Sequence, residues 1–171
     1  MTGDTAKGPP AAEGIDSPVR ALAIVSAELL ETIRNAQLAL EDCVDGRGGT
    51  TALNRTADLL HQARGALQIT ETYGAALLVE EMEHAARYLA SLRAGKGRAD
   101  GLDALTRAMV QLPAYIESLL AGGRDIALVL LPILNDLRAA RGQPPVSYTH
   151  LRAHETNDLI SYAVVGWKKG G

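Results

Sequence analysis

The stretch that decides the fold is residues 59–68, which read LLHQARGALQ. At about 100° per residue, its apolar side chains fall on one side of a helix and its polar side chains on the other. His61 lies almost opposite the middle of the apolar side, close to Gly65 and Gln68. The stretch therefore predicts an amphipathic helix that buries one face and presents the imidazole of His61 to water.

The same three-and-four spacing of apolar residues predicts a further helix before this one and three after it. Ser17-Pro18 starts the first, as an N-cap followed by proline at the first helical position. We expect Pro113 and Pro132 to kink the helices that contain them, because a mid-helix proline loses a hydrogen bond. The five expected helices cover about 17–44, 50–73, 75–94, 100–121 and 125–141.

Composition and connections together predict the fold class. The chain has no Phe, one Trp and five Tyr, so its apolar content is mostly Leu, Ala, Ile and Val. Ala and Leu are strong helix formers, whereas sheets favour aromatic and β-branched residues. Short Gly-rich connections between long amphipathic helices make neighbours antiparallel. We therefore expect an all-α fold, an antiparallel helix bundle, over residues 17–142.

The totals limit the classes of partner. A chain of 171 residues suits one domain, and its net charge of −3 gives no basic face for nucleic acid. A single cysteine, Cys43, fits a reducing compartment. No apolar run approaches the ~20 residues that span a membrane. Residues 1–16 have no apolar signal segment, so we expect a disordered leader and a cytoplasmic protein.

The chain changes character after Gln143-Pro144-Pro145. Residues 146–156, VSYTHLRAHET, closely resemble translated sequencing-adapter read-through, and the alternative is a divergent natural C-terminus. We expect residues 143–171 to be unstructured or artefactual, with the native sequence after about Pro145 unseen. His150 and His154 have metal-ligand spacing, but no third ligand follows, so we expect no metal site.

The constellation that carries possible chemistry is His61, Arg64 and Gly65. Glycine inside a helix costs about 1 kcal/mol relative to alanine, so its presence needs a compensating reason. One turn after His61, it would leave a dent through which a partner could reach the ring. Arg64, at i+3, could hold a phosphoryl group there. The alternative is an ordinary surface histidine, with Gly65 kept for helix packing elsewhere.

Other polar residues give weaker signals. We interpret His84 as a half-buried packing residue at the edge of its apolar stripe. Glu80, Glu81 and Glu83 are interpreted as a solvated face with one carboxylate near the edge of the core. No Gly-rich phosphate loop, Ser-His-Asp order or CxxC pair occurs in the sequence. We therefore expect no catalytic site, no enzyme activity and no cofactor.

His61-x-x-Arg64-Gly65 resembles the H-x-x-K-G motif of histidine phosphotransfer (Hpt) domains, which are four-helix bundles. The segments 60–68, 72–83, 111–116 and 130–142 resemble the N-terminal region of hybrid histidine kinases of type IV pilus chemosensory systems (the ChpA/PilL type), a region shared by FimL-type scaffold proteins. The resemblance covers about residues 19–142. It implies an Hpt-like four-helix core with a fifth C-terminal helix.

The resemblance implies two alternative roles in twitching motility. In the first, His61 is the phosphoacceptor of a phosphorelay, supported by Arg64, Gly65 and Gln68, and its partners are a histidine kinase domain and a receiver domain. In the second, a degenerate Hpt-like scaffold docks polar signalling proteins, as FimL-type relatives are thought to do without a phosphorylatable histidine. Arg64 replaces the usual lysine, and Gln62 replaces the usual small hydroxyl residue. The chain could be the N-terminal part of either parent protein.

Overall fold

The computed structural model describes residues 18–152. The elements are the α-helices α1 (Pro18–Val44), α2 (Gly49–Ile69), α3 (Tyr73–Ser91) and α4 (Lys96–Leu120), the 3₁₀-helix η1 (Ala127–Leu130) and the α-helix α5 (Leu131–Ala140). Ser17, the expected N-cap, and the expected leader 1–16 lie outside the described residues. None of the helices within 18–152 is both long enough and apolar enough to cross a bilayer.

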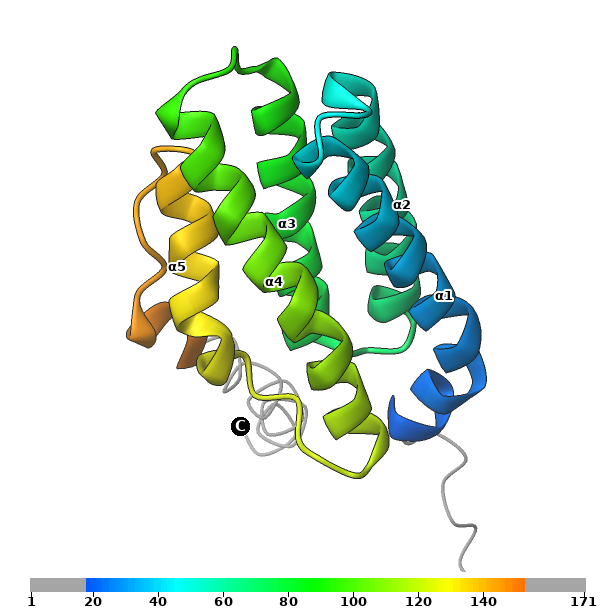
Figure 1. Cartoon of the computed structure of the whole chain (residues 1–171). Helices are drawn as coiled ribbons and strands as arrows, with labels where there is room; N and C mark the ends of the chain where they lie inside the picture. Colours follow the sequence, from blue (N-terminus) through cyan, green and yellow to red (C-terminus); the bar gives the residue numbers. More distant parts are fainter. Residues whose placement is uncertain (1–17, 153–171) are drawn as a thin grey trace, which may run out of the picture.

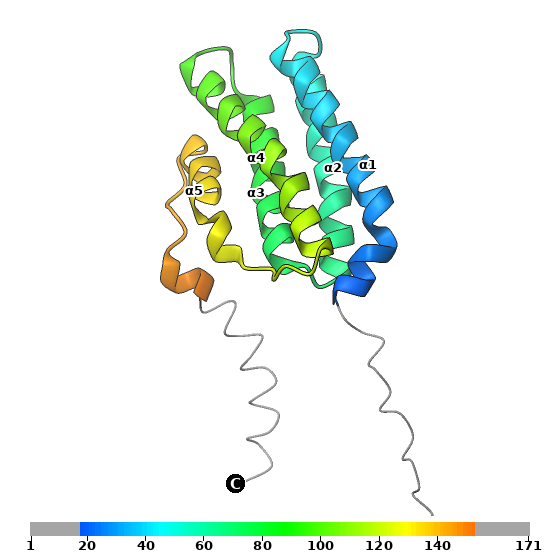
Figure 2. The same ribbon diagram turned by 60° about the horizontal axis from the view of Figure 1, so that its bottom comes forward.

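Helices α1 to α4 form an antiparallel bundle, and α5 packs on its outside against α3 and α4 (Figures 1 and 2). The expected all-α bundle with a four-helix core and a fifth helix is confirmed. Each helix places its apolar stripe inward, and α1, α2, α3 and α4 each contribute fully buried large side chains, those of α1 being Leu22, Ile33 and Leu40. Those of the other three helices include Leu53, Leu60, Leu67, Leu78, Met82, Leu89, Leu105, Met109 and Leu112.

The boundary between α2 and α3 differs from the sequence expectation. We expected Tyr73-Gly74 to end α2, but α2 ends at Ile69 and Gly74 lies in the first turn of α3. The turn is closed by Glu71, which adopts a left-handed φ of 57°, and by the amide of Thr72, which donates to the carbonyl of Leu67 at 2.9 Å.

Gly74 is needed for close packing instead. A Cβ there would meet the carboxylate of Asp125, which accepts the Gly74 amide at 2.7 Å and the Tyr115 hydroxyl at 2.6 Å. The α4–α5 connection is thereby tied to the start of α3.

Of the two prolines expected to kink their helices, Pro113 lies mid-helix and Pro132 does not. Pro113 lies inside α4, as expected. The expected kink at Pro132 is wrong, because the fifth helix does not start at about Asp125. It starts at Leu131 after a 3₁₀ turn, so Pro132 falls in its first turn, where a missing amide hydrogen costs nothing.

The fifth helix is held by a buried carboxylate as well as by apolar packing. Ile133, Leu134 and Leu137 are buried beneath it. Glu81 of α3, only 5% exposed, pairs with Arg138 of α5 at 2.8 Å and with Arg141 just after it. The two guanidinium groups satisfy both carboxylate oxygens, so this cluster pins α5 to α3.

The chain after Gly142 does not match the expectation of an unstructured tail, as far as Arg152. The side chain of Asn135 in α5 donates a hydrogen bond to the carbonyl of Val146 at 3.3 Å and accepts one from the amide of Val146 at 2.7 Å. Arg138 donates to the carbonyl of Pro144 at 2.7 Å, and Leu151 is 1% exposed. These hydrogen bonds, from side chains of α5 to the main chain of the tail, and one buried leucine hold residues 143–152 along α5 (Figure 1). Residues 153–171, including His154, lie outside the described part.

Candidate functional site

The candidate site lies where the middle of α2 crosses the middle of α3. The side chain of His61 is 58% exposed, whereas that of Glu83, opposite it on α3, is 7% exposed. His61 Nδ1 lies 3.1 Å from Glu83 Oε1 and 3.3 Å from Oε2. An exposed imidazole is therefore held from beneath by a buried carboxylate.

The contact with Glu83 favours one tautomer of the neutral imidazole ring. An ionised carboxylate can only accept, so Nδ1 must be the donor in its hydrogen bond to Glu83. The proton on Nδ1 leaves Nε2 with a lone pair. Within residues 18–152, Nε2 makes no hydrogen bond. The exposed nitrogen is therefore the nucleophilic one.

Arg64 lies closer to the ring than an independent surface cation would. Its Nη2 is 3.2 Å from His61 Nδ1, and its Nη1 is 3.3 Å from Glu83 Oε2. The first contact is not a hydrogen bond while Nδ1 carries its proton, because both groups are then donors. We favour the ion pair, since the alternative would leave a lone pair of Nδ1 facing the carboxylate. Arg64 thus supports Glu83 directly and the ring through it.

A second arginine, Arg87, also pairs with Glu83. Arg87 Nε and Nη2 both lie 3.3 Å from Glu83 Oε1, and Nη2 also lies 3.2 Å from Asp58 Oδ1 on α2. The buried carboxylate of Glu83 is therefore flanked by two cations, Arg64 and Arg87.

Gly65 leaves open space beside His61. A Cβ built at Gly65 would meet nothing within 4 Å. No neighbouring side chain among the described residues therefore requires glycine at this position. The expected dent beside the ring, and the alternative of an ordinary surface histidine, both stay predictions. Gln68, one turn further on the same face, is exposed, and the described residues give its side chain no hydrogen bond.

Substituting Gly65 with Ala should raise the free energy of unfolding by about 0.5–1 kcal/mol, because the new methyl group fits and the helix gains propensity. Gly101 in α4 is the matched control, since a Cβ there would lie 2.5 Å from Leu89 Cδ2. Gly101→Ala should lower the free energy of unfolding by about 1–3 kcal/mol. Urea unfolding of both variants checks this, and a loss of stability in Gly65→Ala would contradict the open space.

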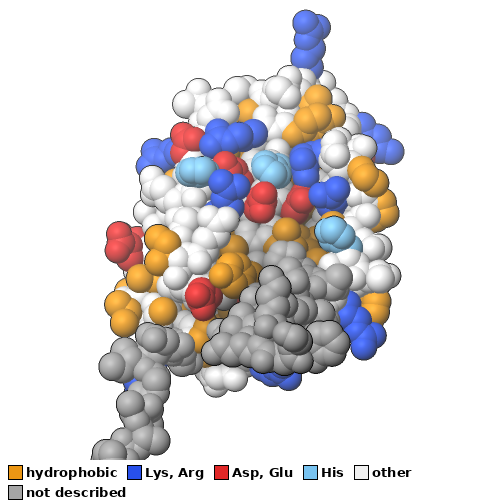
Figure 3. Space-filling view, turned by 180° about the vertical axis from the view of Figure 1, so that it is seen from behind, with side chains coloured by type: hydrophobic (Ala, Val, Ile, Leu, Met, Phe, Trp, Pro, Cys, Tyr) orange, Lys and Arg blue, Asp and Glu red, His pale blue; other side chains and the backbone are white. Residues whose placement is uncertain are grey.

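Charged and histidine side chains gather on this side of the molecule (Figure 3). They include Glu83 with its arginines on α2 and α3. They also include Glu81 of α3 with its arginine on α5. His84 is half-buried, as its position at the edge of the apolar stripe indicates. The described residues contain no group of three or more His, Cys, Asp or Glu placed to hold a metal.

Sequence reasoning missed Glu83, and its interpretation of the acidic run was wrong. Glu81 and Glu83 are each only 5% exposed, and Glu80 is half-buried. Arginines from α2 and α5 pair with the two buried carboxylates. A signal was present, because His61 and Glu83 lie eleven residues before and after Thr72, in the turn of an antiparallel helix pair. Residues equidistant from such a turn face each other.

Comparison with known proteins gives one relationship. The chain is 33% identical over 123 residues to the scaffold protein FimL of Pseudomonas aeruginosa, an alignment that covers 72% of this chain. The chain is similar to a part of FimL. The expected resemblance to FimL-type proteins is confirmed, whereas the resemblance to ChpA/PilL-type kinases stays a prediction.

The FimL-like region is a small part of that relative. The alignment spans 22% of the FimL sequence. No family profile and no solved structure matches the chain. The geometry of the His61 site is therefore the main basis for a more specific proposal.

Proposed function

We propose that this FimL-like bundle is a protein-docking module of a type IV pilus signalling system and that it presents His61 as a phosphoacceptor. The observation that carries the proposal is the 3.1 Å contact between His61 Nδ1 and the buried Glu83, with the ring 58% exposed. The FimL relationship supports the docking role. In this role the domain is a substrate of partner proteins and not itself an enzyme.

The chemistry of the step follows from the tautomer. The lone pair of Nε2 attacks the γ-phosphorus of ATP held by a kinase domain, the N–P bond forms, and the bond to the bridging oxygen breaks to release ADP. Because Nε2 carries no proton, none has to be removed. The ring then carries a positive charge, which Nδ1–H shares with the carboxylate of Glu83. An aspartate of a receiver domain next attacks phosphorus and restores the neutral ring.

The arginines near the ring could balance the negative charge that a phosphoryl group would add. A phosphoryl group brings about −1.5 to −2 charge at neutral pH. Arg64 is 21% exposed on its side chain and shares Glu83 with Arg87, so it could turn to the phosphoryl oxygens without leaving Glu83 unpaired. The open space at Gly65 would let the active site of a partner reach Nε2.

The test is labelled phosphoryl transfer from a type IV pilus histidine kinase, followed by addition of a receiver domain. The wild-type domain should become labelled and pass the label to the receiver, whereas His61→Gln should incorporate none. His84→Gln is the matched control and should be labelled like the wild type. Equal labelling of wild type and His61→Gln, or labelling of neither, would contradict the phosphoacceptor role.

The second candidate is a scaffold that docks signalling proteins without phosphorylation. Two observations favour it: the relative is named a scaffold protein, and Arg64 is tied to Glu83 instead of standing free beside the ring. Under this candidate, His61→Gln should leave both partner binding and twitching motility unchanged. Loss of motility in His61→Gln with partner binding intact would exclude it.

A further inference from the structure

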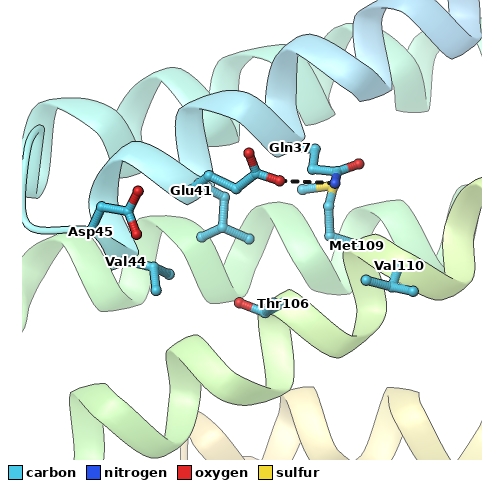
Figure 4. A pocket seen from close by; sticks show the side chains of 8 residues that line it. Gln37, Glu41, Val44, Asp45, Thr106, Met109 and Val110 are labelled. Carbon is cyan, nitrogen blue, oxygen red and sulfur yellow. Dashed lines mark hydrogen bonds between the residues drawn. The ribbon is translucent and has the colours of Figure 1, made fainter.

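Two inter-helix surfaces lie alongside α4, and the described residues fill the one between α3 and α4 but leave the one between α1 and α4 open. On one side of α4, the short helix α5 packs against α3 and α4 and buries Ile133, Leu134 and Leu137. On the other side, between α1 and α4, lies an open groove of about 290 Å³ (Figure 4). Helices α1 and α4 face the viewer in Figure 1, in front of α2 and α3, which carry His61 and Glu83.

The groove between α1 and α4 is apolar at its base and sides. Leu40 and Met109, which are 2% and 1% exposed, contribute to its lining. Val44 of α1 and Val110 of α4 flank it and are 54% and 65% exposed. Exposed valines on both walls of a groove offer apolar area that a partner could remove from water.

The charges of the groove have one sign. Glu41 of α1 and Asp45, the residue that follows α1, line it, and none of the described residues in its lining is Lys or Arg. The side chain of Glu41 accepts a hydrogen bond from the neutral amide of Gln37, at 3.0 Å, and no cation among residues 18–152 pairs with it (Figure 4). Asp45 pairs at 2.8 Å with Arg47, but both side chains are more than half exposed, and such pairs are weak.

We propose that the α1–α4 groove docks a cationic amphipathic helix of a partner protein. The occupant places apolar side chains between Val44 and Val110 and a Lys or Arg beside Glu41. A helix is the expected form because the groove runs between two helices, as does the surface that α5 occupies on the other side of α4. The acidic lining selects a basic partner helix over an acidic one.

This proposal is independent of phosphorylation at His61. The groove is formed by α1 and α4, whereas the candidate site is formed by α2 and α3. A partner helix could therefore stay docked while a second protein reaches His61. That arrangement would let one small bundle hold two proteins at once.

The test uses a labelled amphipathic peptide of about four helical turns with leucine on one face and lysine beside it, and a matched peptide with glutamate for lysine. Fluorescence anisotropy should show saturable binding of the lysine peptide and none of the glutamate peptide. Val110→Asp and Glu41→Lys should each weaken binding at least about tenfold.

The chain offers matched controls for both substitutions. Val129, in η1, is 64% exposed and lies outside the groove, so Val129→Asp introduces the same charge at equal exposure. Glu31 is an exposed acid on α1 that does not line the groove, so Glu31→Lys changes net charge equally. Both controls should bind like the wild type.

Three results would overturn the proposal. Equal weakening in groove and control variants would mean that binding depends on net charge alone. Failure of the lysine peptide to bind the wild type would exclude a cationic helix. Concentration-dependent dimerisation in sedimentation, abolished by Val110→Asp and not by Val129→Asp, would make a second copy the occupant instead.

Discussion

Glu81→Ala should lower the free energy of unfolding by about 3 kcal/mol, the largest stability loss expected for one exchange on this polar face. The carboxylate is buried and pairs with Arg138 and Arg141, whose side chains are only 22% and 14% exposed. Removing it leaves two poorly solvated cations without a counter-ion, which costs more than the ion pair itself contributes. Because both arginines belong to the α5 region, that helix should loosen first.

Urea unfolding gives the stability change, and amide hydrogen exchange shows where it acts. Protection should fall in α5 before it falls in α2. Glu80→Ala is the control, since Glu80 is half-buried on the same helix and has no ion pair among the described residues. A loss below 1 kcal/mol for Glu81→Ala, or an equal loss for Glu80→Ala, would show that the cluster does not hold α5.

Glu83→Gln should slow phosphoryl transfer to His61 by about 10- to 100-fold. A hydrogen bond to a charged group is worth about 1.5–3 kcal/mol, and the amide lacks the charge that stabilises the ring once Nε2 carries phosphorus. The amide also offers a donor to Nδ1, which permits the other tautomer. Single-turnover labelling with a kinase domain measures the rate.

A readout that ordinary destabilisation would not change is the tautomer of His61. In the wild type, the imidazole ¹⁵N spectrum should show a proton on Nδ1 and none on Nε2, and in Glu83→Gln it should show a mixture. Asp58→Asn is the control, because Asp58 pairs with Arg87 without touching the ring. An unchanged tautomer and an unchanged rate in Glu83→Gln would show that Glu83 does not orient the ring of His61.

Much of the fold follows from local pattern. The apolar stripes predict five helices and the short connections predict their antiparallel packing. The errors arose where a local signal had a tertiary cause. Gly74 looked like a helix end, but it is glycine because Asp125 packs against it. Pro132 looked like a kink, but a 3₁₀ turn before it places it at a helix start.

The site could be predicted only in part for a similar reason. The helical stripe is enough to indicate that His61 is exposed, because exposure depends on its own helix. The partner of Nδ1 depends on the register between α2 and α3, which is set by a turn closed at Glu71 and not at Gly74. With the turn misplaced, Glu83 could not be paired with His61, and its burial among arginines has no local signature.

We infer that Nε2 of His61 is the reactive nitrogen of an exposed imidazole oriented by Glu83. Treating the ¹⁵N-histidine-labelled protein with phosphoramidate, a small phosphoryl donor, and recording ³¹P–¹⁵N couplings tests it without any partner protein. We expect one phosphorylated histidine, His61, with phosphorus on Nε2, and no reaction in His61→Gln. Phosphorus on Nδ1, preferential labelling of His84 or His150, or an unmodified His61 would contradict it.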